Sequence, residues 1–234
     1  MWIRAFLLML AYCGTALANP CAVPAELLDG TALPRSRVAI EARELRILVG
    51  GSASAEPGAL TTAPYHARLA TALTERYPGL IVRVEPRGRR GASAAEVLAL
   101  IEREVPALRP HLIIWQTGTV EAARNLDPGE FTDKLGEGIT RLRAHADVML
   151  MDPQFSRFMR ANADIDRYRD AIRLAAAAEG ITLLRRWDWM RQWADQDGLD
   201  LERAPREERT AQLARLQECV ARGIAGQIAL GIRR

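Results

Sequence analysis

The segment "VGGSAS", residues 49 to 54, joins an apolar run to a turn of small residues and carries two serine hydroxyls. A serine on a glycine turn at the end of a strand, such as Ser52, can act as a nucleophile while backbone N–H groups surround the developing oxyanion. Glycine-rich turns also bind phosphate at helix N-termini, and small residues allow a tight turn without any chemistry. The turn alone leaves these three explanations open.

The elements that would position this turn alternate along the chain. Short apolar runs predict five strands, at residues 45–50, 80–85, 111–116, 147–152 and 181–186. Amphipathic segments predict five helices, at residues 64–77, 93–105, 129–145, 164–180 and about 207–230. This alternation predicts an α/β fold with three layers, in which helices cover both faces of a five-stranded parallel sheet. The loops after Gly50, Glu85, Gln116 and Asp152 then share the edge where such sheets bind ligands.

The first residues indicate export. Arg4 precedes an apolar run that ends in Ala16-Leu17-Ala18, the pattern of a secretory signal peptide over residues 1–18. We therefore expect a single mature domain of residues 19–234, located in the periplasm or secreted. The apolar run is too short to span a membrane, and no later segment approaches the ~20 apolar residues that a span needs.

Two cysteines remain after Cys13 leaves with the signal peptide, Cys21 and Cys219. In an oxidising compartment they form a natural disulfide pair. Two buried free thiols are the alternative, because spacing alone does not show that the residues are close in space.

The charge pattern and the histidines exclude several classes of function. The formal net charge is +3, and basic and acidic residues are interspersed, which argues against a nucleic-acid-binding surface. The three histidines are scattered and no Cys-x-x-Cys pair is present, so we expect no metal site and no cofactor. Nothing in the sequence indicates the oligomeric state.

The loops after the predicted strands resemble the SGNH/GDSL hydrolase family of secreted esterases and deacetylases. That family has a Gly-Asp-Ser turn after the first strand, a glycine after the second, Gly-x-Asn after the third and Asp-x-x-His near the C-terminus. The matching segments here are "VGGS" (49–52), "RRGAS" (89–93) and "IIWQTGTVEAARN" (113–125). "LMDPQF" (150–155) and "RRWDWMRQW" (185–193) are similar to an exported bacterial branch of the family. The resemblance implies a flavodoxin-like sandwich and hydrolysis of a small-molecule or saccharide ester.

The resemblance also implies roles for individual residues. Ser52 would be the nucleophile, with its own N–H and that of Gly91 as oxyanion donors. The ligand-binding rim would include Gly50, Gly51, Gly118 and Asp152. The family's aspartate is replaced by Gly51, and its third oxyanion donor, an asparagine, is replaced by Val120, whose side chain cannot donate a hydrogen bond. A register that starts one residue later would put Ala53 at the nucleophile position.

The catalytic histidine of the family has no counterpart. The best local match to Asp-x-x-His is "DGLD", from Asp197 to Asp200, in which Asp200 replaces the base. Counting back from Cys219 instead gives "EERTA" (207–211), which also lacks a histidine. A serine hydroxyl without a base is a poor nucleophile near neutral pH.

None of the three histidines is expected to serve as that base. His111 and His145 directly precede predicted strands, so they belong at the opposite edge of the sheet. His66 lies early in the first predicted helix, and we interpret it as an ordinary packed or surface residue. Trp189 and Trp193 are four residues apart, which favours one buried helix face over a sugar-stacking surface.

Two functions therefore compete. The first is an exported SGNH-type ester hydrolase with incomplete machinery, and the second is a non-catalytic binding or envelope-interaction protein on the same fold. A phosphate- or nucleotide-binding flavodoxin-like protein is a weaker third, because no Walker or Gly-x-Gly-x-x-Gly pattern is present.

Overall fold

A computed structural model describes residues 21–58 and 62–234. Its five strands form one parallel sheet in the order β2-β1-β3-β4-β5. The strands are β1 (Glu44–Gly51), β2 (Ile81–Gly88), β3 (Leu112–Gln116), β4 (Asp147–Met151) and β5 (Thr182–Leu184). The expected signal peptide, residues 1–18, lies outside the described residues.

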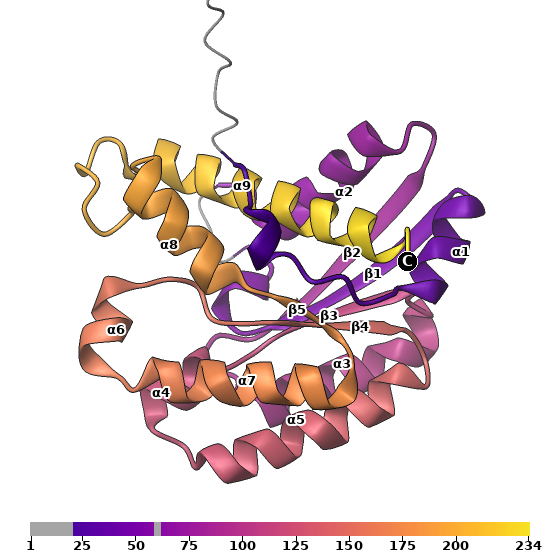
Figure 1. Cartoon of the computed structure of the whole chain (residues 1–234), viewed down its shortest axis with the longest axis horizontal. Helices are drawn as coiled ribbons and strands as arrows, with labels where there is room; N and C mark the ends of the chain where they lie inside the picture. The colour runs from indigo at the N-terminus through magenta and orange to yellow at the C-terminus, as the bar shows by residue number, and fades with distance from the viewer. Residues whose placement is uncertain (1–20, 59–61) are drawn as a thin grey trace, which may run out of the picture.

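Helices lie on both faces of the sheet, so the predicted three-layer α/β/α sandwich is confirmed (Figure 1). One face carries α1 (Pro34–Glu41), α2 (Tyr65–Arg76), α8 (Arg186–Gln196) and α9 (Arg209–Gly231). The other carries α3 (Ala94–Leu108), α4 (Thr119–Arg124), α5 (Pro128–Arg143) and α7 (Ile165–Glu179). A short helix, α6 (Arg157–Asn162), and two 3-10 turns, η1 (Ala25–Leu27) and η2 (Ala53–Ala55), complete the elements of the described residues.

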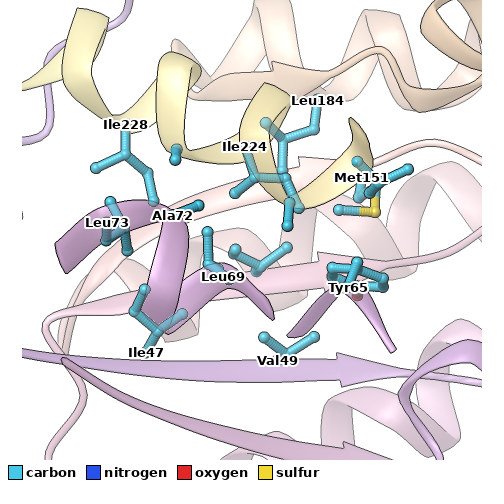
Figure 2. Packing of buried hydrophobic residues seen from close by; sticks show 14 of the residues in the cluster. Ile47, Val49, Tyr65, Leu69, Ala72, Leu73, Met151, Leu184, Ile224 and Ile228 are labelled. Carbon is cyan, nitrogen blue, oxygen red and sulfur yellow. The ribbon is translucent and has the colours of Figure 1, made fainter. Parts of the chain in front are cut away.

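The side chains of each strand alternate between two apolar cores. In β1, Ile47 and Val49 face α2 and α9, whereas Leu48 faces α3. Figure 2 shows the first core, where Leu69 of α2 and Ile224 of α9 pack together above β1. Because both faces are covered, the central strands are apolar throughout, which explains why short apolar runs predicted them.

The tryptophans of the segment 185–193 belong to these cores. Trp189 and Trp193 lie on α8 with ring centroids 6.4 Å apart, and neither is exposed. Trp187 packs on the opposite core, against Phe155. The packing explanation for Trp189 and Trp193 is therefore correct, and the sugar-stacking one is wrong.

A disulfide joins Cys21 to Cys219 in α9, as predicted, with their Cα atoms 4.7 Å apart. It ties the start of the described chain to the helix that covers β1. Two indole N–H groups of α8 hold the same N-terminal segment, because Trp193 donates to the carbonyl of Ala22 and Trp189 to that of Leu27.

The main error in the predicted elements is at the fifth strand. Residues 181–186 were expected to be extended, but β5 ends at Leu184 and α8 begins at Arg186. The apolar run "ITLL" is followed by two arginines, and Arg186 enters the helix instead of continuing the strand. This early end places the Arg186 side chain at the edge of the sheet that carries the candidate site.

Candidate functional site

Ser52 follows β1 directly, at the point where the sheet order reverses between β1 and β3. Its hydroxyl oxygen accepts a hydrogen bond from the N–H of Gly91 at 3.0 Å. Gly91 has a φ of +75°, in the left-handed region that side chains rarely adopt, so a glycine suits this turn. The loop after β2 thus brings the expected donor Gly91 to the Ser52 hydroxyl.

A buried carboxylate joins the loop after β2 to the loop after β3. Glu121 accepts from the N–H of Ala94 at 2.5 Å through one oxygen and from the N–H of Gly118 at 3.0 Å through the other. Only 3% of Glu121 is exposed. Gly118 has a φ of +92° and is the N-cap residue of α4. Glu121 was not predicted from the sequence, although a glutamate at the third position of a helix is the usual signal for such a backbone cap.

Val120 lies in the first turn of α4 and lines the same cavity as Ser52, Thr117 and Thr119. Its side chain is apolar and cannot donate a hydrogen bond. The backbone N–H of Gly91 is therefore the donor that the structure brings to the Ser52 hydroxyl.

A network of buried polar groups lies beside Ser52. The hydroxyl of Ser54 donates to Oε1 of Gln116 at 2.6 Å, and Nε2 of Gln116 donates to the hydroxyl of Tyr65. The guanidinium of Arg186 donates through Nη1 to Gln116 Oε1 at 3.2 Å and to the Ser54 hydroxyl at 3.4 Å. We call these four residues the Arg186 network. It unites β3, α2, α8 and the loop after β1 at the carboxyl edge of the sheet.

Gly50 and Gly51 let the network and α3 approach β1 closely. A Cβ on Gly50 would lie 2.3 Å from a methyl carbon of Ile101. A Cβ on Gly51 would lie 2.8 Å from Nε2 of Gln116 and 3.0 Å from the Cβ of Ala55. A side chain at position 51 would therefore meet the amide of Gln116.

Asp152, at the end of β4, is 1% exposed and accepts from the N–H of Trp187 at 2.9 Å. Burial raises the pKa of Asp152 to about 6, although this hydrogen bond and the charges of Arg169 and Arg186 oppose the rise. Its second oxygen lies 3.6 Å from Nε of Arg169. Asp152 thus helps to fix the start of α8, and with it the position of Arg186.

The two aspartates of the degenerate Asp-x-x-His segment lie apart from these contacts. Asp197 is exposed at the end of α8. Asp200 accepts from Nε of Arg157 at 2.6 Å and from the N–H groups of Glu202 and Arg203. Burial opposes ionisation of Asp200, but these hydrogen bonds and the charge of Arg157 lower its pKa. A carboxylate held in this way is a weak proton acceptor.

The histidines occupy the positions that the sequence indicated. His111 accepts from the N–H of Arg46 at the amino edge of the sheet, and His145 lines a pocket with it there. His66 is buried on α2 with its ring edge-to-face against Tyr65, and burial lowers its pKa. Across the described residues, no hydrogen bond joins Ser52 to a histidine or a carboxylate.

Two cavities meet at Ser54. The smaller, of about 30 Å³, is lined by Ser52, Ser54, Gln116, Val120 and Arg186, among others. The larger, of about 290 Å³, is lined by Ser54 together with residues of α8, α9 and the loops after β4 and α8. Its walls include Phe155, Met190, Leu199, Leu213 and Leu216. Asp200 lines the larger cavity, so it shares a pocket with Ser54.

A model of the non-GDSL lipase-like family matches residues 20–234. The chain belongs to this family. No curated protein sequence matches it significantly.

Within the residues described, no helix is both long and apolar enough to cross a bilayer. No group of three or more histidine, cysteine or acidic residues among them is placed to hold a metal.

Solved esterase structures share the fold. Axe2, an acetylxylan esterase from Geobacillus stearothermophilus, is 18% identical over 76% of this chain and 94% of its own, with a TM-score of 0.59. LAE5, an α/β hydrolase enzyme from the metagenome of Lake Arreo, Spain, is 19% identical over 79% of this chain and 96% of its own, with a TM-score of 0.57. Catalytic mutants of Axe2 replace a serine, an aspartate or a histidine. The predicted SGNH/GDSL-like family and fold are confirmed.

Proposed function

We propose that this protein is an exported ester hydrolase of low activity, with Ser52 as nucleophile and acylated saccharides as its substrate class. The observation that carries the proposal is the 3.0 Å hydrogen bond from the N–H of Gly91 to the Ser52 hydroxyl, at the switch point of the sheet. It holds the serine hydroxyl beside a backbone N–H, which would stabilise an oxyanion once a bound ester carbonyl replaces the hydroxyl as its acceptor. The likeness to an acetylxylan esterase supports the choice of substrate, and the signal-like residues 1–18 with the disulfide support export.

Low activity follows from the chemistry of the site. Without a histidine beside Ser52, little of its hydroxyl is activated near neutral pH. Losing the asparagine donor at the position of Val120 typically lowers kcat by a factor of about 10² to 10³. A reaction that retains only backbone donors is expected to exceed the uncatalysed rate by a small margin.

The test is hydrolysis of p-nitrophenyl acetate by the mature protein. We expect slow turnover that Ser52→Ala reduces to the buffer rate, because the nucleophile is removed. Thr71→Ala, which deletes an exposed hydroxyl on α2, is the matched control and should keep the wild-type rate. Equal rates for wild type and Ser52→Ala would reject the hydrolase.

That result would favour the second candidate, a non-catalytic binding protein that retains the same rim. The observation in its favour is the lack of a base: among the described hydrogen bonds, Ser52 has a backbone N–H as partner and no side chain that accepts its proton. The same assay therefore separates the two functions.

A further inference from the structure

Arg186 brings a buried charge to the site without a carboxylate at contact distance. Only 5% of the residue is exposed, and none of the described carboxylate oxygens lies within 4.0 Å of its guanidinium. Arginines that are this deeply buried are normally paired with an acidic group. Asp152 acts on Arg186 at longer range and is itself in contact with Arg169.

The guanidinium also has hydrogen-bonding capacity to spare. Nη1 donates to two neutral oxygens, those of Gln116 and Ser54, while the buried Nε has no partner. A guanidinium carries five N–H donors in a planar fork that matches the two oxygens of a carboxylate. A small planar anion therefore matches the unused N–H donors of the Arg186 guanidinium.

The position of Arg186 connects it to space that a ligand could occupy. It lines the 30 Å³ cavity that also borders Ser52, a volume that suits a water molecule or one oxygen of a ligand and not a whole molecule. Ser54 lies between this cavity and the 290 Å³ pocket, whose walls are largely apolar. Ser54 lines both spaces, so the cation borders the smaller one and the apolar walls border the larger one.

We propose that Arg186 is the anion-binding group of a subsite beside Ser52, and that this subsite takes the carboxylate of a ligand whose apolar chain occupies the adjacent pocket. The carboxylate would replace the Ser54 hydroxyl as a partner of the guanidinium. Identifying this ligand as the acid released from an ester rests on the proposed function, whereas the binding itself does not.

Another cation, Arg157, also lines the larger pocket and is the competing anchor for a carboxylate. Its charge is already engaged, because Asp200 lies 2.6 Å and Asp195 3.3 Å from its nitrogens. Glu202, on the same rim, accepts from Ser156 and from the N–H of Phe158. The charged groups that line the larger pocket therefore already have partners. Arg186, which lines the smaller cavity, has no carboxylate partner.

The experiment is calorimetric titration of the mature protein with sodium hexanoate, using hexanamide as the neutral probe of similar shape and acetate as the short probe. We expect hexanoate to bind at least about tenfold more tightly than hexanamide, because the hydrogen bonds to Arg186 are charge-assisted. Acetate should bind more weakly than hexanoate, because it leaves the apolar walls uncovered. Equal affinities for hexanoate and hexanamide would overturn the proposal.

Two variants identify which arginine binds the carboxylate. Arg186→Met should remove the preference for hexanoate over hexanamide, and Arg157→Gln should retain it; the reverse pattern would overturn the proposal. A crystal of the wild-type protein soaked in hexanoate gives the same answer if Arg186→Met fails to fold. A carboxylate bonded to Arg186 supports the subsite, and one bonded only to Arg157 rejects it.

The outcome for the subsite is independent of catalysis. Ser52→Ala should bind hexanoate as the wild type does, because Ser52 does not contribute to the cation. Selective hexanoate binding without any ester turnover would reject the hydrolase and support the subsite. Ester turnover without selective hexanoate binding would support the hydrolase and reject the subsite.

Discussion

Arg169 of α7 and Arg186 of α8 are both 5% exposed and both lie near Asp152, yet their surroundings differ in kind. Arg169 is paired with Asp166 at 2.7 Å, Asp188 at 2.6 Å and Asp152 at 3.6 Å, and its guanidinium lies 4.9 Å from the ring of Trp187. Arg186 contacts neutral oxygens. A buried arginine with three acidic neighbours is part of the architecture, whereas one without them is available to a ligand. Substitution of each arginine separates these two roles.

Replacing Arg169 should have the largest effect on stability. Arg169→Met leaves Asp152 buried without its contacting cation, and breaking a buried pair in this way costs about 3–5 kcal/mol. The measurement is the free energy of unfolding in urea at pH 7. Arg173→Met, one turn further along α7, is the matched control and should cost less than about 1 kcal/mol, because Arg173 is more exposed.

A change at Asp152 should have an intermediate effect that depends on pH. The folded-state pKa of Asp152, about 6, is above its ordinary value of 3.8, so the folded protein binds more protons than the unfolded chain between these values. The contribution of Asp152 to stability therefore falls as the pH rises from about 4 to 6. Relative to Asp152→Asn, the wild type should be more stable at pH 4 than at pH 7 by about 2 kcal/mol.

The measurement is the difference in unfolding free energy between wild type and Asp152→Asn at several pH values. Asp166→Asn is the control, because Asp166 also contacts Arg169 but is mostly exposed. A difference that stays constant from pH 4 to pH 7 would show that the buried carboxylate is ionised throughout.

Replacing Arg186 should have the smallest effect on stability. Exchanging a buried charge for an apolar side chain of similar size is often neutral or stabilising, and Ser54 can still donate to Gln116 in Arg186→Met. We expect the unfolding free energy to stay within about 1 kcal/mol of the wild type at pH 7. A loss as large as that for Arg169→Met would make the two arginines equivalent and remove the argument for a ligand.

The fold was predictable because its signals are local. Each central strand is a short apolar run, and Ser93 with Glu96 forms a capping box at the start of α3, a pattern with a fixed local spacing. The contact of Ser52 with Gly91 was also predictable, because parallel strands bring successive loops to one edge of the sheet.

The Arg186 network was not predictable from local signals. In the sequence, Tyr65 lies 51 residues and Arg186 lies 70 residues from Gln116. None of the three residues stands out in its own segment. Their meeting depends on the early end of β5, which turns Arg186 toward the site. The identity of Val120 was visible in the sequence, but the residue that supplies charge beside it was not.

The packing around Gly51 constrains how this chain relates to enzymes with a Gly-Asp-Ser turn. An aspartate at this position would displace Gln116, whose amide lies 2.8 Å from where its Cβ would be, and would thereby release Tyr65, Ser54 and Arg186 from their shared hydrogen bonds. A one-residue reversion toward a Gly-Asp-Ser turn is therefore expected to shift the amide of Gln116 and to disturb the Arg186 network.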